Sequence, residues 1–137
     1  MPDKKFKFLD HQKNLQLRAF GDNLAELFSN AALAMMTFSY PRQVDFQQYE
    51  TNEKIELKAE NLNNLMVGWL SEIIYLSDSK DCCYSKFNIS QIENDEIKAI
   101  ISGRRAKTKQ KITKVISRDI KIKEIATGWV ADIVFEI

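Results

Sequence analysis

The sequence predicts an α+β fold, a two-layer sandwich in which two main helices pack on one face of a mixed or antiparallel sheet. Two segments, 24–37 and 62–74, carry apolar residues at the three- and four-residue spacing of amphipathic helices. Several other segments alternate apolar and polar residues, as half-buried strands do. Two helices with apolar faces need an apolar sheet to cover, and 137 residues suffice for one domain, 1–137, with one core.

The first elements are two short strands and a helix. Apolar residues alternate with polar ones over 6–8 and again over 15–19, which predicts two strands. Asn23 can cap the helix that follows, with Glu26 three residues later in a box-like arrangement. We expect this helix to end before Pro41, because the residue preceding a proline is pushed out of the helical region.

The rest of the chain supplies the second helix and most of the strands. Residues 55–59 alternate as a strand, and Asn61 can cap the second helix, whose periodicity is the strongest in the chain. The segment 87–101 has short alternating and apolar runs typical of strands. The last strand covers 129–137, and Gly128 stands where a hairpin turn would precede it.

Composition restricts the class of protein. A hydrophobic fraction of 45% with 28% charged residues is typical of a soluble globular protein. Cys82 and Cys83 are adjacent, so they rarely pair with each other and cannot build a four-ligand zinc site alone, which favours a reducing compartment. No segment has the apolar length of a signal peptide or a membrane span, so we expect a cytoplasmic protein without a membrane partner.

The sequence contains no recognisable catalytic constellation. His11 is the only histidine, which excludes a histidine-based metal cluster. There is no serine–histidine–aspartate order, no glycine loop for phosphate and no supported cysteine–histidine pair. We therefore expect no enzymatic activity and no small-molecule substrate.

Positive charge is concentrated in one segment, which we call the basic strip. Residues 104–123 carry about +8, although the net charge of the whole chain is +1. The segment could be a solvated strand edge, a contact for RNA phosphates or a contact for an acidic protein. It has no aromatic residue to stack on single-stranded bases. Its basic residues are Arg104, Arg105, Lys107, Lys109, Lys111, Lys114, Arg118, Lys121 and Lys123.

Four segments resemble the archease family, in the same order along the chain. Residues 10–21 are similar to the opening His-Thr-Ala-Asp signature with its downstream arginine and glycine, and 30–34 resemble the centre of the first helix. Residues 65–76 are similar to the second helix with its Trp-Leu-x-Glu-x-x-Tyr element, and 128–137 to the terminal strand with its penultimate acid. The family's sandwich of strand–helix–strand–strand elements agrees with the fold predicted above.

The resemblance implies a non-enzymatic accessory protein. It would promote guanylylation and turnover of a GTP-dependent RNA ligase in tRNA splicing or RNA repair. That ligase would be the protein partner, and RNA is a second candidate partner. The alternative is a divergent binding module that uses the basic strip to contact RNA or an acidic protein, without an activator or metal function.

The resemblance also implies a calcium-type metal site at Asn14, Glu136 and the carboxylate of Ile137. The family has aspartate at the first of these positions, whereas Asn14 offers only a neutral carbonyl oxygen. Hard cations prefer several oxygen ligands, most of them charged. We therefore expect calcium, the only cofactor implied, to bind weakly or not at all.

The resemblance further places partner-binding residues at Asp10, His11 and Arg118. A histidine of the family corresponds to Arg118, which is a permanent cation without a lone pair for a metal. We expect Arg118 to form an ion pair with Glu136 in the space of the metal.

Overall fold

The computed structural model describes residues 4–10, 13–41, 48–107 and 110–137. Its strands and helices follow the sequence pattern closely, apart from residues 110–127. In chain order they are β1 (Phe6–Asp10), β2 (Asn14–Gly21), α1 (Leu24–Ser39), β3 (Thr51–Lys58), α2 (Leu62–Lys80), β4 (Cys82–Ile92), β5 (Glu96–Arg105), β6 (Lys114–Val115), the 3₁₀ turn η1 (Ser117–Asp119), β7 (Lys121–Ile125) and β8 (Gly128–Glu136).

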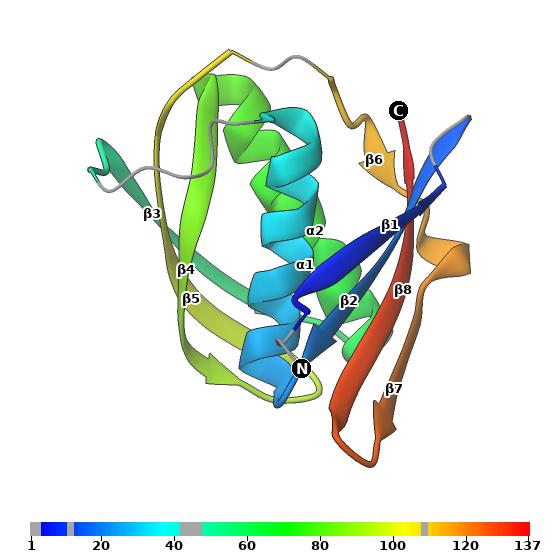
Figure 1. Cartoon of the computed structure of the whole chain (residues 1–137). Coiled ribbons are helices and arrows are strands. Elements are labelled where there is room, and N and C mark those ends of the chain that lie inside the picture. Colours follow the sequence, from blue (N-terminus) through cyan, green and yellow to red (C-terminus); the bar gives the residue numbers. More distant parts are fainter. Residues whose placement is uncertain (1–3, 11–12, 42–47, 108–109) are drawn as a thin grey trace.

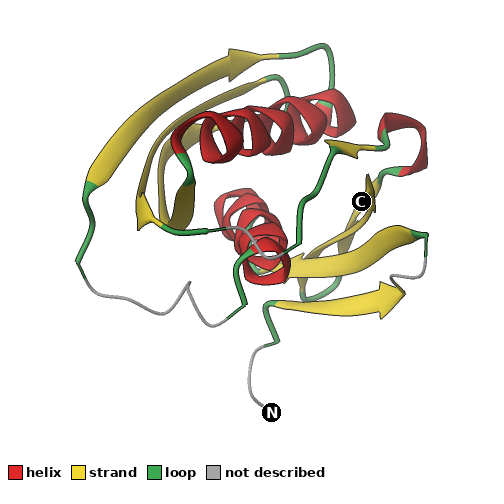
Figure 2. Cartoon of the chain, turned by 90° about the horizontal axis from the view of Figure 1, so that it is seen from above, coloured by secondary structure: helices red, strands yellow, loops and turns green. Residues whose placement is uncertain are grey.

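The strands form two antiparallel sheets, and the two helices lie between them (Figures 1 and 2). The larger sheet has the order β1-β2-β8-β6, with β7 also paired to β8, and the smaller has the order β3-β5-β4. The α+β class is confirmed. The expectation of one sheet with both helices on one face differs from this arrangement, because α1 contacts β2 of one sheet and β4 of the other.

Helix α1 can serve both sheets because apolar residues surround most of it. A helix that is apolar on nearly all sides is stable only when it is buried on all of them. Its buried apolar residues are Leu27, Phe28, Ala31, Ala32, Ala34, Met35 and Met36.

Both predicted helix caps are confirmed. The Asn23 side chain accepts a hydrogen bond from the backbone N–H of Glu26 at 2.9 Å, and the Glu26 carboxylate accepts one from the N–H of Asp22 at 3.0 Å. The Asn61 side chain accepts from the N–H of Asn64 at 2.9 Å.

No helix of the described residues is both long and apolar enough to cross a bilayer.

Two glycines fix where β2 passes into α1. A Cβ on Gly21 would collide with the backbone of Leu27, so β2 can approach the first turn of α1 only because the residue is glycine. Gly128 has a φ of +139°, which glycine adopts without a steric penalty, and it opens β8 directly beside Gly21. This close packing aligns β2 and β8 along their full length, and their outer faces carry the candidate site.

Candidate functional site

A groove lies on the outer face of the larger sheet, which no helix covers. Alternate residues of β2 and β8 are buried against the core, and the residues between them, which include Asn14, Gln16 and Asp132, face outward. The groove has a volume of about 310 Å³, and we call it the β8 groove. It is lined by Leu9, Asn14, Gln16, Leu17, Asp119, Lys121, Asp132, Ile133 and Val134.

Three polar residues form a row across the end of the sheet, next to the β8 groove. Asn14 of β2 and Lys114 of β6 both stand opposite Glu136 of β8, one on each side. Directly opposed residues of antiparallel strands share one face, so the three side chains are neighbours. The Lys114 ammonium lies 3.8 Å from the Glu136 carboxylate.

Arg18 and Asp132 connect β2 and β8 further along the same face. The Arg18 guanidinium donates two hydrogen bonds to the Asp132 carboxylate, at 2.6 and 3.1 Å. This planar two-point contact is the geometry that distinguishes arginine from lysine. The contact raises the pKa of Arg18. The arginine of the opening motif therefore joins the two strands that line the groove.

Arg118 does not pair with Glu136, so that expectation is wrong. Arg118 lies in η1 with an exposed side chain, and its nearest carboxylate is that of Asp119, 3.9 Å away. The reason is that η1 interrupts the pairing with β8 between β6 and β7, so Arg118 has no register position opposite Glu136. Glu136 faces Lys114 instead.

The residues at this end of the sheet do not fit a divalent cation. Glu136 contributes one side-chain carboxylate, which a lysine ammonium already faces, and the Ile137 carboxylate would be one further charged ligand. Asn14 contributes a neutral amide, and among the described residues no three His, Cys, Asp or Glu side chains converge on one point. A calcium ion needs six or more oxygen ligands with several charges among them. Ile137 follows β8 with 40% of its surface exposed.

The structure brings Asn14 and Glu136 together, as the resemblance implied. Asp10 ends β1 opposite Gln16, although its side chain lies outside the description, and His11 lies outside the described residues altogether. Sequence reasoning missed Gln16, Asp132 and Lys121 as groove residues. The alternation of β2 could have indicated Gln16, whereas the other two depend on which strands pair.

The basic strip is divided between the two sheets. Arg104 and Arg105 end β5, Lys107 follows, and Lys109 lies outside the described residues. The Lys111 ammonium lies 3.8 Å from Asp78 at the end of α2. The remaining basic residues belong to β6, η1 and β7 of the larger sheet. The strip is therefore not one face of one strand.

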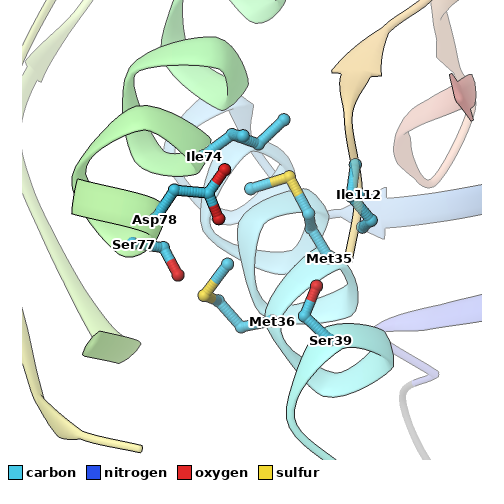
Figure 3. Close-up of a pocket in the computed structure, with 7 residues that line it drawn as sticks. All are labelled: Met35, Met36, Ser39, Ile74, Ser77, Asp78 and Ile112. Carbon is cyan, nitrogen blue, oxygen red and sulfur yellow. The ribbon is translucent and has the colours of Figure 1, made fainter. Parts of the chain in front are cut away.

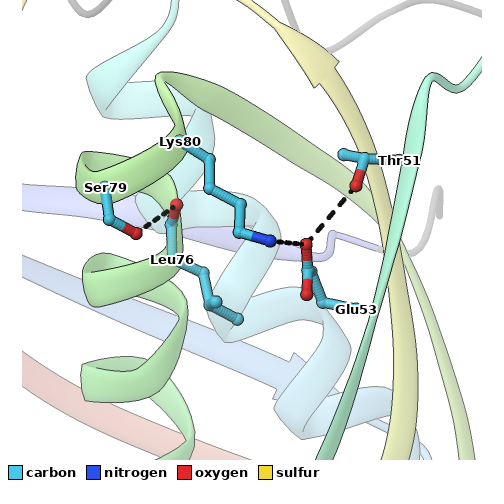
Figure 4. Close-up of polar contacts among 5 residues, drawn as sticks. All are labelled: Thr51, Glu53, Leu76, Ser79 and Lys80. Carbon is cyan, nitrogen blue, oxygen red and sulfur yellow. Dashed lines mark hydrogen bonds and ion pairs between the residues drawn. The ribbon is translucent and has the colours of Figure 1, made fainter.

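A second cavity, of about 400 Å³, lies between the end of α2 and the smaller sheet. Lys80 pairs with Glu53 there, and the Thr51 hydroxyl lies 3.4 Å from the same carboxylate (Figure 4). Cys82 also lines the cavity, and burial raises the pKa of its thiol. A protonated thiol is a poor nucleophile, so this cavity offers less chemistry than the β8 groove.

Comparison with known proteins identifies the family. The model of the archease protein family matches residues 6–137. The archease of Methanosarcina mazei is 31% identical over 143 residues, covering 98% of this chain and 97% of that protein.

Two solved structures have the same fold. A solution structure from Methanobacterium thermoautotrophicum has a TM-score of 0.72 at 21% identity, covering 97% of this chain and 99% of the other. A Thermotoga maritima archease, described as a possible chaperone, has a TM-score of 0.67 at 16% identity, covering 96% of each chain. The chain belongs to the archease family.

Proposed function

We propose that this chain is a non-enzymatic accessory protein that binds a GTP-dependent RNA ligase and promotes its guanylylation and turnover. Membership of the archease family supports an accessory role. The description of the Thermotoga relative as a possible chaperone supports action on another protein. The ligase contact itself is inferred from the family resemblance of the opening and terminal segments.

One observation favours the β8 groove as the contact surface. Two of the family-like segments, the opening motif and the terminal strand, pair as β2 and β8 from Asn14 opposite Glu136 to Gly21 opposite Trp129, and polar residues of both line one groove. Helices cover the inner face of this sheet, so the groove is the part of these segments that a partner can reach. Packing in the core does not account for these outward polar residues, whereas binding to a partner would.

The groove can stabilise one conformation of a partner without chemistry of its own. The amides of Asn14 and Gln16 can both donate and accept hydrogen bonds, and Lys121 adds an exposed cation. An accessory protein shifts the partner's equilibrium only by as much as it binds one state more tightly than another. Groove contacts that form only in the guanylylation-competent ligase would have that effect.

The test is RNA ligation under multiple turnover by the ligase of the same organism, with and without this chain. We expect the chain to raise the turnover rate, and the double variant Gln16→Ala/Lys121→Ala to need about tenfold more protein for half of the effect, which corresponds to about 1.4 kcal/mol of binding. The matched control is Asn88→Ala/Lys58→Ala, which removes an exposed amide and an exposed amine from the smaller sheet.

The outcomes separate two failures. A ligase that binds the chain but turns over at an unchanged rate contradicts the accessory role. A control variant that loses activation while the groove variant keeps it places the contact on the other sheet.

The alternative of an RNA-binding module has less support. Three cations of the basic strip lie beside a carboxylate of the chain: Lys111 beside Asp78, Lys114 beside Glu136 and Arg118 beside Asp119. Phosphate binding would compete with these pairs. A salt titration of RNA binding distinguishes the two functions, because several phosphate contacts would give a steep loss of affinity with salt.

A further inference from the structure

The end of β8 holds a cation of the chain's own where the family resemblance implies a metal. We propose that the Lys114 ammonium takes the place of the divalent cation beside Glu136, so that the β8 groove is built without calcium. This inference concerns the chain alone and does not depend on the ligase as partner.

The strand register places Lys114 there. Glu136 has Asn14 as its direct neighbour on one side and Lys114 on the other, and the Lys114 Nζ lies 3.8 Å from the Glu136 Oε1. A metal bound to Glu136 would have to displace this ammonium or share the carboxylate with it. Two positive charges on one carboxylate repel each other, and Asn14 supplies no compensating negative charge.

Hydrogen bonds on both sides of Lys114 fix its backbone opposite Glu136, so the amine remains within reach of the carboxylate. The N–H of Thr113 donates to the carbonyl of Glu136 at 2.7 Å, and the N–H of Ile116 donates to the carbonyl of Val134 at 2.8 Å. Val115, the other residue of β6, is buried opposite Phe135. These contacts anchor a strand of two residues whose outward side chain is Lys114.

The other carboxylates of this face are compensated in the same way. Asp132 accepts the two hydrogen bonds of Arg18, and Asp119 lies 3.9 Å from the guanidinium of Arg118. Lys121 stands directly opposite Asp132 on β7 and adds a further cation. Three carboxylates thus face four basic side chains in the described part of this face, namely Asp119, Asp132 and Glu136 against Arg18, Lys114, Arg118 and Lys121. Together with the carboxylate of Ile137, which the resemblance also assigns to the site, these charges balance, so the region has no net negative charge to attract a divalent cation.

The substitution has a functional consequence. In a site that binds calcium, the ion would add stability to the end of β8 in proportion to its concentration. Here the charge is covalently attached to β6, so the geometry of the groove is independent of the calcium concentration.

The experiment compares the thermal unfolding of four proteins in millimolar calcium and in sodium chloride of equal ionic strength. They are the wild type, Lys114→Arg, Lys114→Met and the double variant Asn14→Asp/Lys114→Met. The double variant restores one negative charge and removes the ammonium. An ion that binds only the folded state raises the Tm. We expect no calcium-dependent change for the wild type and Lys114→Arg, and a rise of several degrees, reversed by a chelator, for the double variant.

Isothermal titration of calcium into the same proteins gives a second readout that does not depend on unfolding. Heat of binding in the double variant, and none in the wild type, supports the proposal. A wild-type Tm that rises by several degrees with calcium overturns it. A double variant that binds no calcium also overturns it, since Asn14 and Lys114 would then not be what excludes the ion.

Discussion

In α2, whose sequence resembles the second helix of the family, Trp69 packs in the core and does not line the β8 groove. Trp69 is fully buried, and its indole N–H donates to the backbone carbonyl of Phe28 at 3.0 Å. The centre of its ring also lies 6.2 Å from the centre of the Phe87 ring in β4. Trp69 therefore connects α2 with α1 and with the smaller sheet. Tyr75 of the same helix, by contrast, is 65% exposed. The tryptophan of this motif is therefore explained by packing, and the tyrosine is not.

Replacing Trp69 with phenylalanine should destabilise the chain by about 2–3 kcal/mol, because the Phe28 carbonyl loses its buried donor and a void remains. Urea unfolding of the variant measures this cost. Tyr75→Phe is the matched control and should change the free energy of unfolding little. Equal effects of the two substitutions would contradict the assignment of Trp69 to the core.

The two buried cysteines should make the free energy of unfolding decrease at alkaline pH. Both thiols are free and buried at the start of β4, and burial raises the pKa of Cys83 from near 9 to about 12. Because the folded pKa is the higher one, the neutral thiol stabilises the fold fully below pH 9, and this contribution is lost as the pH rises towards 12.

We expect the wild-type Tm to fall more steeply than that of Cys83→Ala between about pH 9 and 12. Thermal melts across this range measure both slopes. The pKa of Tyr84 is also raised by burial, but that residue is present in both proteins and so cancels in the comparison. Parallel slopes would show that Cys83 does not titrate on unfolding.

At the scale of elements, the helices begin where side-chain caps are available. Asn61 stands at the start of α2 with an extended backbone and accepts from the N–H of Asn64. The first four N–H groups of a helix have no partner inside the helix, so such a cap satisfies a donor that would otherwise be exposed or orphaned.

Asn61→Ala should lower the free energy of unfolding by about 1 kcal/mol. Asn63→Ala is the control, because Asn63 is an exposed residue of the same helix and alanine is the better helix former there. Chemical denaturation of both variants measures the difference. A control that destabilises as much as Asn61→Ala would mean that the cap contributes nothing.

At the scale of the whole molecule, the connection from β5 to β6 joins the two sheets across the helix ends. Ile112 is buried beside Met35 of α1 and Ile74 of α2, around a small space of about 10 Å³ (Figure 3). The nearby contact of Lys111 with Asp78 fixes the same segment. This packing positions β6, and therefore Lys114, at the edge of β8.

Ile112→Ala should destabilise the chain by about 2–3 kcal/mol through the cavity that it leaves. It should also increase hydrogen exchange at the amides of Thr113 and Ile116, which hold β6 to β8. Ile100→Ala is the control, because Ile100 is 49% exposed on the outer face of the smaller sheet. An unchanged exchange rate at these amides would show that β6 is anchored without Ile112.

Much of the fold and part of the site could be predicted from local sequence. Periodicity and capping residues indicated both helices, and alternation indicated β1, β2, β3 and β8, because a side chain's direction follows directly from the helix or strand period. The opening motif also indicated that Asn14 and Glu136 belong to one site. Residues 115–122 had no clear period, since they contain the last residue of a two-residue strand, a 3₁₀ turn and part of another strand.

The sequence by itself determined both helices, most of the strands, the family resemblance and a neutral amide at Asn14. Only the tertiary structure decided that the strands divide into two sheets around the helices, and that Lys114 rather than Arg118 faces Glu136. The physical reason is strand register. Which residues stand opposite each other depends on pairing between segments far apart in the chain, and a short turn such as η1 redirects every side chain that follows it.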